Sequence, residues 1–172
     1  MYFSKETSAL DLYQGERVDI LFSIDINEWY GRKTVQLILK DLRPAEHEEN
    51  ELALCQKRFG ELMNGAPLAV GENVIPARED FAAVYTVLRR CVRAGEDTLS
   101  VRRMQSLLYA DGKDIDYIKL RLVYCILEEL NLLEAEETEK DTFRFRLRFT
   151  SSRVDLERSR ILYGLRSRTR MG

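Results

Sequence analysis

The sequence predicts an α+β protein in which a β-hairpin precedes a run of helices, followed by a second β-hairpin and a last helix. Three observations predict this order. Apolar residues alternate with polar ones from about 18 to 40, recur at helical spacing from 46 to 131, and alternate again from 132 to 149. With 172 residues, 45% of them hydrophobic, the chain is long enough for one domain of ordinary size or two small ones.

The first predicted hairpin covers residues 18 to 40, and its two strands share one buried face. Between the strands, Asn27 and Gly31 are the residues most able to adopt the positive φ angles of a hairpin turn. A short strand at Tyr2 and Phe3 brings the count to three. Three strands make an incomplete barrel.

An amphipathic helix is predicted over residues 46–63, because apolar residues recur at helical spacing and acids crowd its first turn, where the helix dipole favours them. Two of the chain's three prolines, Pro67 and Pro76, then fall within residues 64–77, which indicates a loop or interdomain linker. The sequence therefore divides into residues 1–43, a helix with linker at 44–77, and a C-terminal domain at 78–172.

The C-terminal domain begins with three helix signals. The first is an apolar stripe from Phe81, the second lies between Ser100 as N-cap and Gly112 as C-cap, and the third runs from about 114 to 131. Strands at 132–137 and 142–149 follow, with Thr98-Leu99 as a third strand. Three helices followed by a β-hairpin is the order of a winged-helix domain. Ser152 with Asp155 then opens a final helix that reaches about Leu165.

Composition excludes several classes of function. The 27 basic and 29 acidic side chains give a net charge of -2, so a nucleic-acid partner must use a local patch. No run of 18 apolar residues and no secretory leader is found, so we expect a cytoplasmic protein without a membrane partner. Cys55, Cys91 and Cys125 lack CxxC spacing, which favours reduced core residues.

The sequence predicts no catalytic or metal site. Its single histidine, His47, excludes histidine-rich metal clusters within this chain. Asp111, Asp114 and Asp116 are the closest approach to an acidic cluster, and their place at a helix start favours capping.

The turn of the first hairpin combines Trp29 and Tyr30 with Arg32 and Lys33. Aromatic rings that stack on bases, next to cations for the phosphates, are typical of single-stranded nucleic-acid surfaces. The alternative, which the residues favour slightly, is that Trp29 packs over the barrel end or on the following helix.

Alternation in the last strand places Arg144, Arg146 and Arg148 on one face. They could form a ladder for the phosphates of an extended strand. The alternative pairs Arg144 with Glu136 and Arg146 with Glu134 across the hairpin, which leaves Arg148 free.

Further arginines lie on helices and in the basic tail. Each group could touch a DNA backbone or could be solvated polar surface. The third helix carries acids that would repel phosphates, so sequence-specific reading of duplex DNA is not expected. The candidate nucleic-acid-binding arginines are Arg89, Arg90, Arg93, Arg102 and Arg103 on the helices, Arg148 in the strand, and Arg166 and Arg168 in the tail.

Three segments carry a resemblance to a known family. Val18-Asp19-Ile20-Leu21-Phe22, the turn Asn27-Glu28-Trp29-Tyr30-Gly31, and Val35-Gln36-Leu37 through Lys40-Asp41-Leu42-Arg43 resemble the OB-fold region of RecJ-type single-stranded-DNA-specific exonucleases. Pro76-Ala77-Arg78-Glu79-Asp80-Phe81 with Val84-Tyr85 resembles the opening of the C-terminal domain of many RecJ proteins. The resemblance spans nearly the whole chain.

The resemblance implies a partial OB-fold over residues 1–43, then a winged-helix-like domain. It also implies a metal-dependent hydrolase that degrades single-stranded DNA from the 5′ end in repair and recombination. The DHH-type catalytic core of that family precedes the OB-fold and uses manganese or magnesium. No catalytic residue or metal ligand is carried over to this chain, so no cofactor is expected in it.

Two hypotheses follow. In the first, the chain is a non-catalytic module that helps such an exonuclease hold single-stranded DNA. In the second, it is a structural or protein-interaction module that docks on the exonuclease core or on another repair protein. An independent enzyme would need a site that the sequence does not show.

Overall fold

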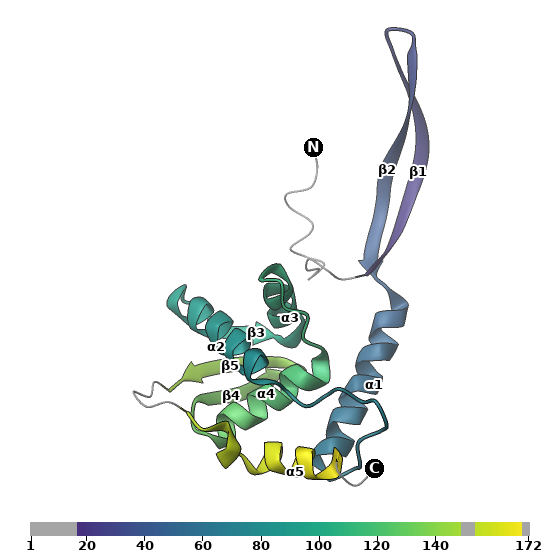
Figure 1. The fold of residues 1–172 in the computed structure, drawn as a ribbon. Helices are drawn as coiled ribbons and strands as arrows, with labels where there is room; N and C mark the ends of the chain where they lie inside the picture. Colours follow the sequence, from purple (N-terminus) through teal and green to yellow (C-terminus); the bar gives the residue numbers. More distant parts are fainter. Residues whose placement is uncertain (1–16, 149–153, 170–172) are drawn as a thin grey trace. The chain divides into compact units, whose positions relative to one another are not determined.

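The computed structural model describes residues 17–148 and 154–169 and divides the chain into two compact units, 1–51 and 52–172. The described residues are α+β, with a two-stranded hairpin, a three-stranded sheet and five α-helices (Figure 1). The predicted strand at Tyr2 and Phe3 lies outside the described residues, and the predicted domain ranges stay predictions. In chain order the elements are β1 (Val18–Trp29), β2 (Arg32–Pro44), α1 (Glu46–Met63), α2 (Arg78–Arg93), β3 (Thr98–Ser100), α3 (Val101–Ala110), α4 (Tyr117–Glu129), β4 (Leu133–Glu139), β5 (Thr142–Leu147), a short 3₁₀ turn (Leu156–Arg158) and α5 (Arg160–Thr169).

β1 and β2 form a long antiparallel hairpin, as the alternation predicts (Figure 1). A register shift at Leu21/Phe22 marks a bulge. The turn holds Tyr30 and Gly31, whose φ angles are 49° and 71°. Two central residues with positive φ are what a two-residue type I′ turn requires. The prediction that Asn27 takes this role was wrong, because Asn27 lies within β1 and pairs with Thr34.

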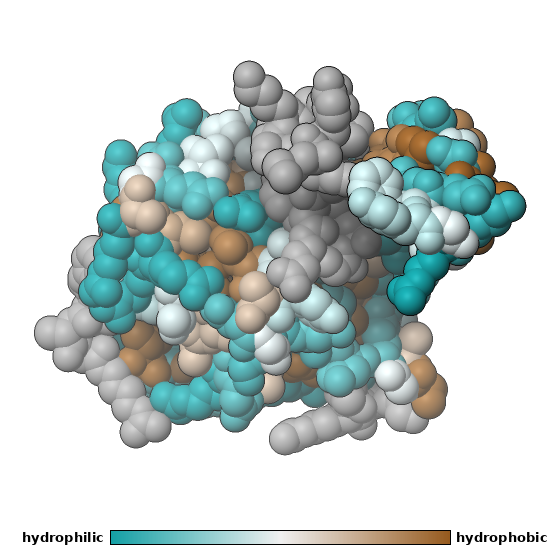
Figure 2. Space-filling model, turned by 90° about the horizontal axis from the view of Figure 1, so that it is seen from above, coloured by the Kyte–Doolittle hydropathy of each residue, from teal (hydrophilic) through white to brown (hydrophobic). Residues whose placement is uncertain are grey.

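One face of the hairpin carries an apolar ladder that lies at the surface. Between the bulge and the turn, the ladder consists of three cross-strand pairs: Phe22 with Leu39, Ile24 with Leu37, and Ile26 with Val35. These six side chains are between 38% and 72% exposed, and brown patches of apolar surface are visible on the hairpin in Figure 2. The predicted shared face is therefore present, but the prediction that it is buried was wrong within the described residues.

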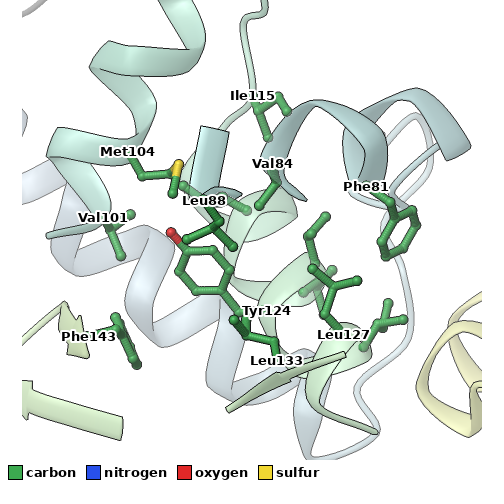
Figure 3. Packing of buried hydrophobic residues seen from close by; sticks show 14 of the residues in the cluster. Phe81, Val84, Leu88, Val101, Met104, Ile115, Tyr124, Leu127, Leu133 and Phe143 are labelled. Carbon is green, nitrogen blue, oxygen red and sulfur yellow. The ribbon is translucent and has the colours of Figure 1, made fainter. Parts of the chain in front are cut away.

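The second unit packs α2, α3 and α4 against a small sheet whose strand order is β3-β5-β4. β3 is the predicted third strand, since Thr98 and Leu99 pair with Arg144 and Phe143. Tyr124 of α4 lies at the centre, with its ring centroid 5.7 Å from that of Phe143 and 5.1 Å from that of Phe145 (Figure 3). These rings belong to one core cluster that also includes Leu88, Met104 and Leu108, and its burial is the dominant favourable term in folding.

Side-chain caps fix the helix starts in this unit. Ser100 accepts a hydrogen bond from the backbone N–H of Arg103 at 3.1 Å, as the sequence predicts for α3. Asp116 accepts one from the N–H of Lys119 at 2.8 Å, so α4 begins at Tyr117 instead of near 114. The short polar side chain of Asp116 satisfies a backbone donor that has no partner within the helix.

Residues 64–77, predicted as a loop or linker, fold back along α1. Arg58 of α1 donates to both carboxylate oxygens of Glu72, at 2.8 and 2.6 Å, and to the carbonyl of Pro67 at 2.8 Å. The Arg58 guanidinium holds the pKa of Glu72 below its usual value, although burial opposes this. Val74 is buried in the core. The loop is thus attached at two points.

The turn between β4 and β5 is anchored by a polar cluster. Asp141, at φ 58°, accepts from the Tyr117 hydroxyl at 2.5 Å, from Arg121 at 2.9 Å and from the Gln56 amide. The Arg121 guanidinium also lies over the Phe143 ring, 4.5 Å from its centroid. This cluster joins α1, α4 and the β-turn.

The last helix begins later than the sequence predicts. Asp155 caps only the short 3₁₀ turn, and α5 starts at Arg160. Ser159 accepts from the N–H of Leu162 at 3.1 Å, while Glu129 of α4 accepts from the Ser159 hydroxyl at 2.5 Å and the Arg160 N–H at 2.8 Å. The prediction was wrong because it took Ser152 and Asp155 for the cap, whereas Ser159 caps α5 and is itself held by Glu129 of another helix. Ser152 lies outside the described residues.

Candidate nucleic-acid interface

The hairpin tip presents two exposed aromatic side chains. Trp29 is 71% and Tyr30 91% exposed, and their ring centroids lie 5.4 Å apart at 80°. The type I′ turn produces this arrangement, because it ends β1 at Trp29 and places Tyr30 at the tip. The alternative in which Trp29 packs on other parts of the chain is not seen among the described residues. Both rings are open to a stacking base.

The two cations of the tip lie on opposite faces. Arg32 is the cross-strand partner of Trp29, so the two share a face, whereas Lys33 pairs with Glu28 on the face of the apolar ladder. The Lys33 ammonium is 3.8 Å from a Glu28 carboxylate oxygen, and both side chains are largely exposed. Such a pair contributes little and breaks easily. Arg32 has no ion pair within the described parts of the chain.

The part of the Trp29 face that favours contact with a nucleic-acid strand is small. Asn27 and Asp25 follow Trp29 along the same face of β1, and Asp25 lies four residues, or about 13 Å, from it. A carboxylate there repels phosphates. The face can therefore stack a base on Trp29 with a phosphate at Arg32, and it extends over one or two nucleotides.

The two arginines of β5, and Arg148 directly after it, each lie close to a carboxylate. The predicted pairs are confirmed, with Arg144 at 3.9 Å from Glu136 and Arg146 at 3.6 Å from Glu134. The prediction that Arg148 stays free was wrong, because it also donates to Glu134, at 2.9 Å from its Nε. This hydrogen bond lowers the pKa of Glu134. One carboxylate thus serves two arginines, and the phosphate ladder is not available in this arrangement.

The arginines of α2 and α3 separate into paired and unpaired groups. Arg90 lies 3.0 Å from Asp111, and Arg103 lies 3.7 Å from Glu96. In residues 17–148 and 154–169, no hydrogen bond or ion pair is found for the side chains of Arg89, Arg93 and Arg102. Arg89 and Arg93 are exposed, and Arg102 is half-buried.

The two tail arginines have intramolecular roles. Arg166 lies 2.6 Å from Glu157. Arg168 donates to the backbone carbonyls of Leu62 and Ala66, at 2.8 and 3.2 Å, and so caps the end of α1. Arg168 therefore holds α5 on α1, a role that its place in a basic tail does not predict.

Sequence reasoning missed one arginine. Arg78 at the start of α2 is exposed, and within the described residues its side chain has no hydrogen bond or ion pair. It lies on the same side of α2 as Arg89, eleven residues or about three turns away. That spacing was the available signal. The cross-strand pairs of Arg144 and Arg146 were foreseen from the alternation, but the pairs of Arg90, Arg103 and Arg166 were not, since they depend on how the elements pack.

The described residues contain no group of three or more histidine, cysteine, aspartate or glutamate side chains placed to hold a metal ion. Of the three aspartates near Gly112, Asp111 pairs with Arg90 and Asp116 caps α4. No helix within the described parts is long and apolar enough to cross a membrane. Cys91 is buried, while Cys55 and Cys125 are half-buried, and all three are free thiols.

Comparison with protein families matches the start of the chain. Residues 1–41 match the family model described as the RecJ OB domain. No curated protein and no solved structure matches the chain. The match covers β1 and most of β2, the segment that presents Trp29, Tyr30 and Arg32. It supports a RecJ-related OB region at the start of the chain.

Proposed function

We propose that this chain is a non-catalytic C-terminal module of a RecJ-like exonuclease that degrades single-stranded DNA from 5′ to 3′ in repair and recombination. The hairpin tip helps to hold the DNA strand. Trp29 and Tyr30 stack on bases, Arg32 contacts a phosphate on the Trp29 face, and Lys33 adds charge from the other face.

The single observation that carries this proposal is the exposed tip within a segment that matches the RecJ OB domain. Two neighbouring aromatic rings, 71% and 91% exposed at the end of a hairpin, form a contiguous apolar surface of the kind that marks interaction sites. OB-folds bind single strands by combining aromatic stacking with a basic surface. The tip of this hairpin has both features.

The remaining arginines make a smaller contribution under this proposal. Arg89, Arg93 and Arg102 add long-range attraction, whereas Arg90, Arg103, Arg148, Arg166 and Arg168 would first have to leave carboxylates or carbonyls. The internal pairing of so many arginines supports a second candidate function for residues 78–172. That function is docking on the exonuclease core or on another repair protein.

A winged-helix-like domain at 78–172 fits the order of elements, α2-β3-α3-α4-β4-β5, and the sheet order β3-β5-β4. Catalysis and its manganese or magnesium ions belong, under this proposal, to a separate catalytic core. The described residues hold no side-chain group that fits such ions. No step of the reaction is therefore assigned to this chain.

Trp29 is the chain's only tryptophan, so its intrinsic fluorescence reports directly on the proposed contact. Titration with an oligothymidine should quench this fluorescence by stacking and reach saturation. Arg32→Ala should weaken binding, whereas Tyr163→Ala, which removes a 73% exposed ring on α5, should not. Unchanged Trp29 fluorescence at saturating oligonucleotide, with binding seen by another method, would remove the tip from the DNA-binding surface.

A further inference from the structure

A hollow of about 400 Å³ lies beside α2 in the second unit. Its floor includes Phe81, Leu127 and Leu132, which are only 5%, 2% and 8% exposed. Phe81 belongs to α2 and Leu127 to α4 (Figure 3). Tyr85 forms a half-buried wall, and its hydroxyl is within 3.4 Å of the Arg148 carbonyl. Among the described residues, the hollow is therefore apolar and open on one side.

Two guanidinium groups border this hollow. Arg78 and Arg89 both line it, and no acidic residue is among its lining residues. Both are exposed, and neither has a hydrogen bond or an ion pair to the parts of the chain that the structure describes. Arg90, next to Arg89 on the same helix, contrasts with them, because its charge is matched by Asp111 at 3.0 Å. The rim of the hollow thus keeps two unmatched positive charges over an apolar floor.

We propose that this hollow binds a short acidic segment of a partner polypeptide. A large apolar side chain of that segment enters the hollow, and carboxylates on either side of it pair with Arg78 and Arg89. The two arginines are eleven residues apart on one helix, about 16 Å along its axis. An extended peptide covers this distance with about five residues, at 3.3 Å each.

The lining favours a peptide over a nucleotide. A base in the hollow would bury the polar atoms of its edge, and the floor of Phe81, Leu127 and Leu132 offers no side-chain hydrogen-bonding groups to satisfy them. A leucine or phenylalanine side chain leaves no polar atom unpaired. Guanidiniums bind both carboxylates and phosphates bidentately, so the preference for a peptide rests on the apolar floor, and the two arginines then pair with the carboxylates of that peptide. The inference goes beyond the proposed binding of single-stranded DNA and names a ligand class for the docking function.

The test is fluorescence-anisotropy titration of the full chain with a labelled octapeptide that has leucine and phenylalanine at its centre and two or three acids at each end. Two matched peptides serve as controls: one replaces the central pair by serines, and the other replaces the acids by their amides. We expect saturable binding of the first peptide only. Binding of neither the parent nor the matched peptides at millimolar concentration would overturn the proposal.

Charge reversal then locates the site. Arg78→Glu with Arg89→Glu should weaken peptide binding at least tenfold, whereas Lys113→Glu, an exposed cation outside the hollow, should not change it. Unchanged thermal unfolding shows that the variants fold, as expected for exposed side chains. Peptide binding that survives the double reversal contradicts the proposal. So does an oligothymidine that loses binding in this variant while the peptide never binds, because the hollow would then be a nucleic-acid site.

The test is independent of the hairpin. Trp29→Ala should leave peptide binding unchanged. The Arg78 and Arg89 reversals remove the long-range attraction of Arg89 and so lower the DNA affinity, but they should leave the quenching of Trp29 at saturating DNA in place. Failure of the peptide site and failure of the tip site are therefore distinguishable.

Discussion

Glu129 shows how a side chain from one helix supports the start of another, because it holds the Ser159 cap of α5 and binds the first backbone N–H groups of that helix. It accepts hydrogen bonds from the Ser159 hydroxyl, the Arg160 N–H and the Ile161 N–H, at 2.5, 2.8 and 3.3 Å. Burial alone would raise the pKa of this carboxyl, but the hydrogen bonds outweigh burial and lower it. The ionised form is therefore the one that the fold binds.

Glu129→Gln should destabilise the protein by about 1–3 kcal/mol, because a neutral amide replaces a charged acceptor and brings donors toward donors. The sign of the pH dependence follows from the lowered pKa. The stabilisation is present above the ordinary pKa of 4.5 and is lost as the pH falls through the lower folded-state value. Thermal unfolding from pH 7 to pH 3 checks both effects. Glu139→Gln, an exposed change in the same residue type, is the control, and an equal loss in both variants would contradict the role of Glu129.

Replacing tyrosine by phenylalanine should have opposite effects on stability at two positions of α4. The Tyr124 hydroxyl is buried and has no hydrogen-bond partner among the described residues, whereas the Tyr117 hydroxyl donates to Asp141 at 2.5 Å. Tyr124→Phe should be neutral or stabilise the fold by about 1 kcal/mol, since it removes an unpaired polar group. Tyr117→Phe should destabilise it by roughly 1.5–3 kcal/mol, since it removes a bond to a carboxylate. Chemical denaturation of both variants decides, and a similar loss in each would show that the Tyr124 hydroxyl is paired.

At the scale of elements, the hydrophobic periodicity predicted which residues of a strand share a face and which residues pair across the hairpin. The alternation from Phe143 to Leu147 predicted the buried face of β5 and the cross-strand pairs with Glu134 and Glu136, and the structure confirms both. Periodicity could not predict that Glu134 also binds Arg148, because that contact joins residues outside direct register. Nor could it predict the exposed ladder of the first hairpin, because alternation shows which residues share a face and not whether another layer covers it.

We expect that replacing the glutamates of β4 that pair with arginines strengthens DNA binding. Glu134→Gln with Glu136→Gln releases Arg144, Arg146 and Arg148, which then lie on one strand face. Oligothymidine binding should become tighter and more dependent on salt, while thermal stability should change little because these pairs are exposed. Glu139→Gln, an exposed change at the end of the same strand, again serves as the control. Unaltered affinity and salt dependence would mean that this face does not meet DNA even when it is positive.

At the scale of the whole molecule, the near balance of basic and acidic side chains limits electrostatic binding to local surface patches. The net charge of -2 gives no general attraction for nucleic acid. Within the described residues, many arginines are matched by acids, so the proposed DNA binding depends on a few local groups. The tip residues Trp29 and Arg32 and the rim residues Arg78 and Arg89 are the sites where aromatic or apolar surface coincides with unmatched charge.

The candidate site could be predicted only where its residues lie close together in the sequence, as they do at the hairpin tip. A turn that holds Trp29, Tyr30, Arg32 and Lys33 in five positions is a local signal, and the exposed rings agree with it. Because the turn has two residues, Trp29 and Arg32 share one face and Lys33 lies on the other. The prediction that Asn27 is a turn residue hid this arrangement. The hollow required residues from α2, α4 and the segment after β5, which only the folded chain brings together.

The most direct test of the proposed function is a fluorescence-anisotropy titration of a labelled oligothymidine at low and moderate salt, with the wild-type chain and with Trp29→Ala/Arg32→Ala. The account predicts saturable binding that weakens as salt rises, because phosphate contacts release counterions. The double variant should bind about 5- to 100-fold more weakly, as expected for loss of one stacked base. Absence of binding at low salt, or equal binding by the double variant, would contradict the proposal that the hairpin tip holds single-stranded DNA.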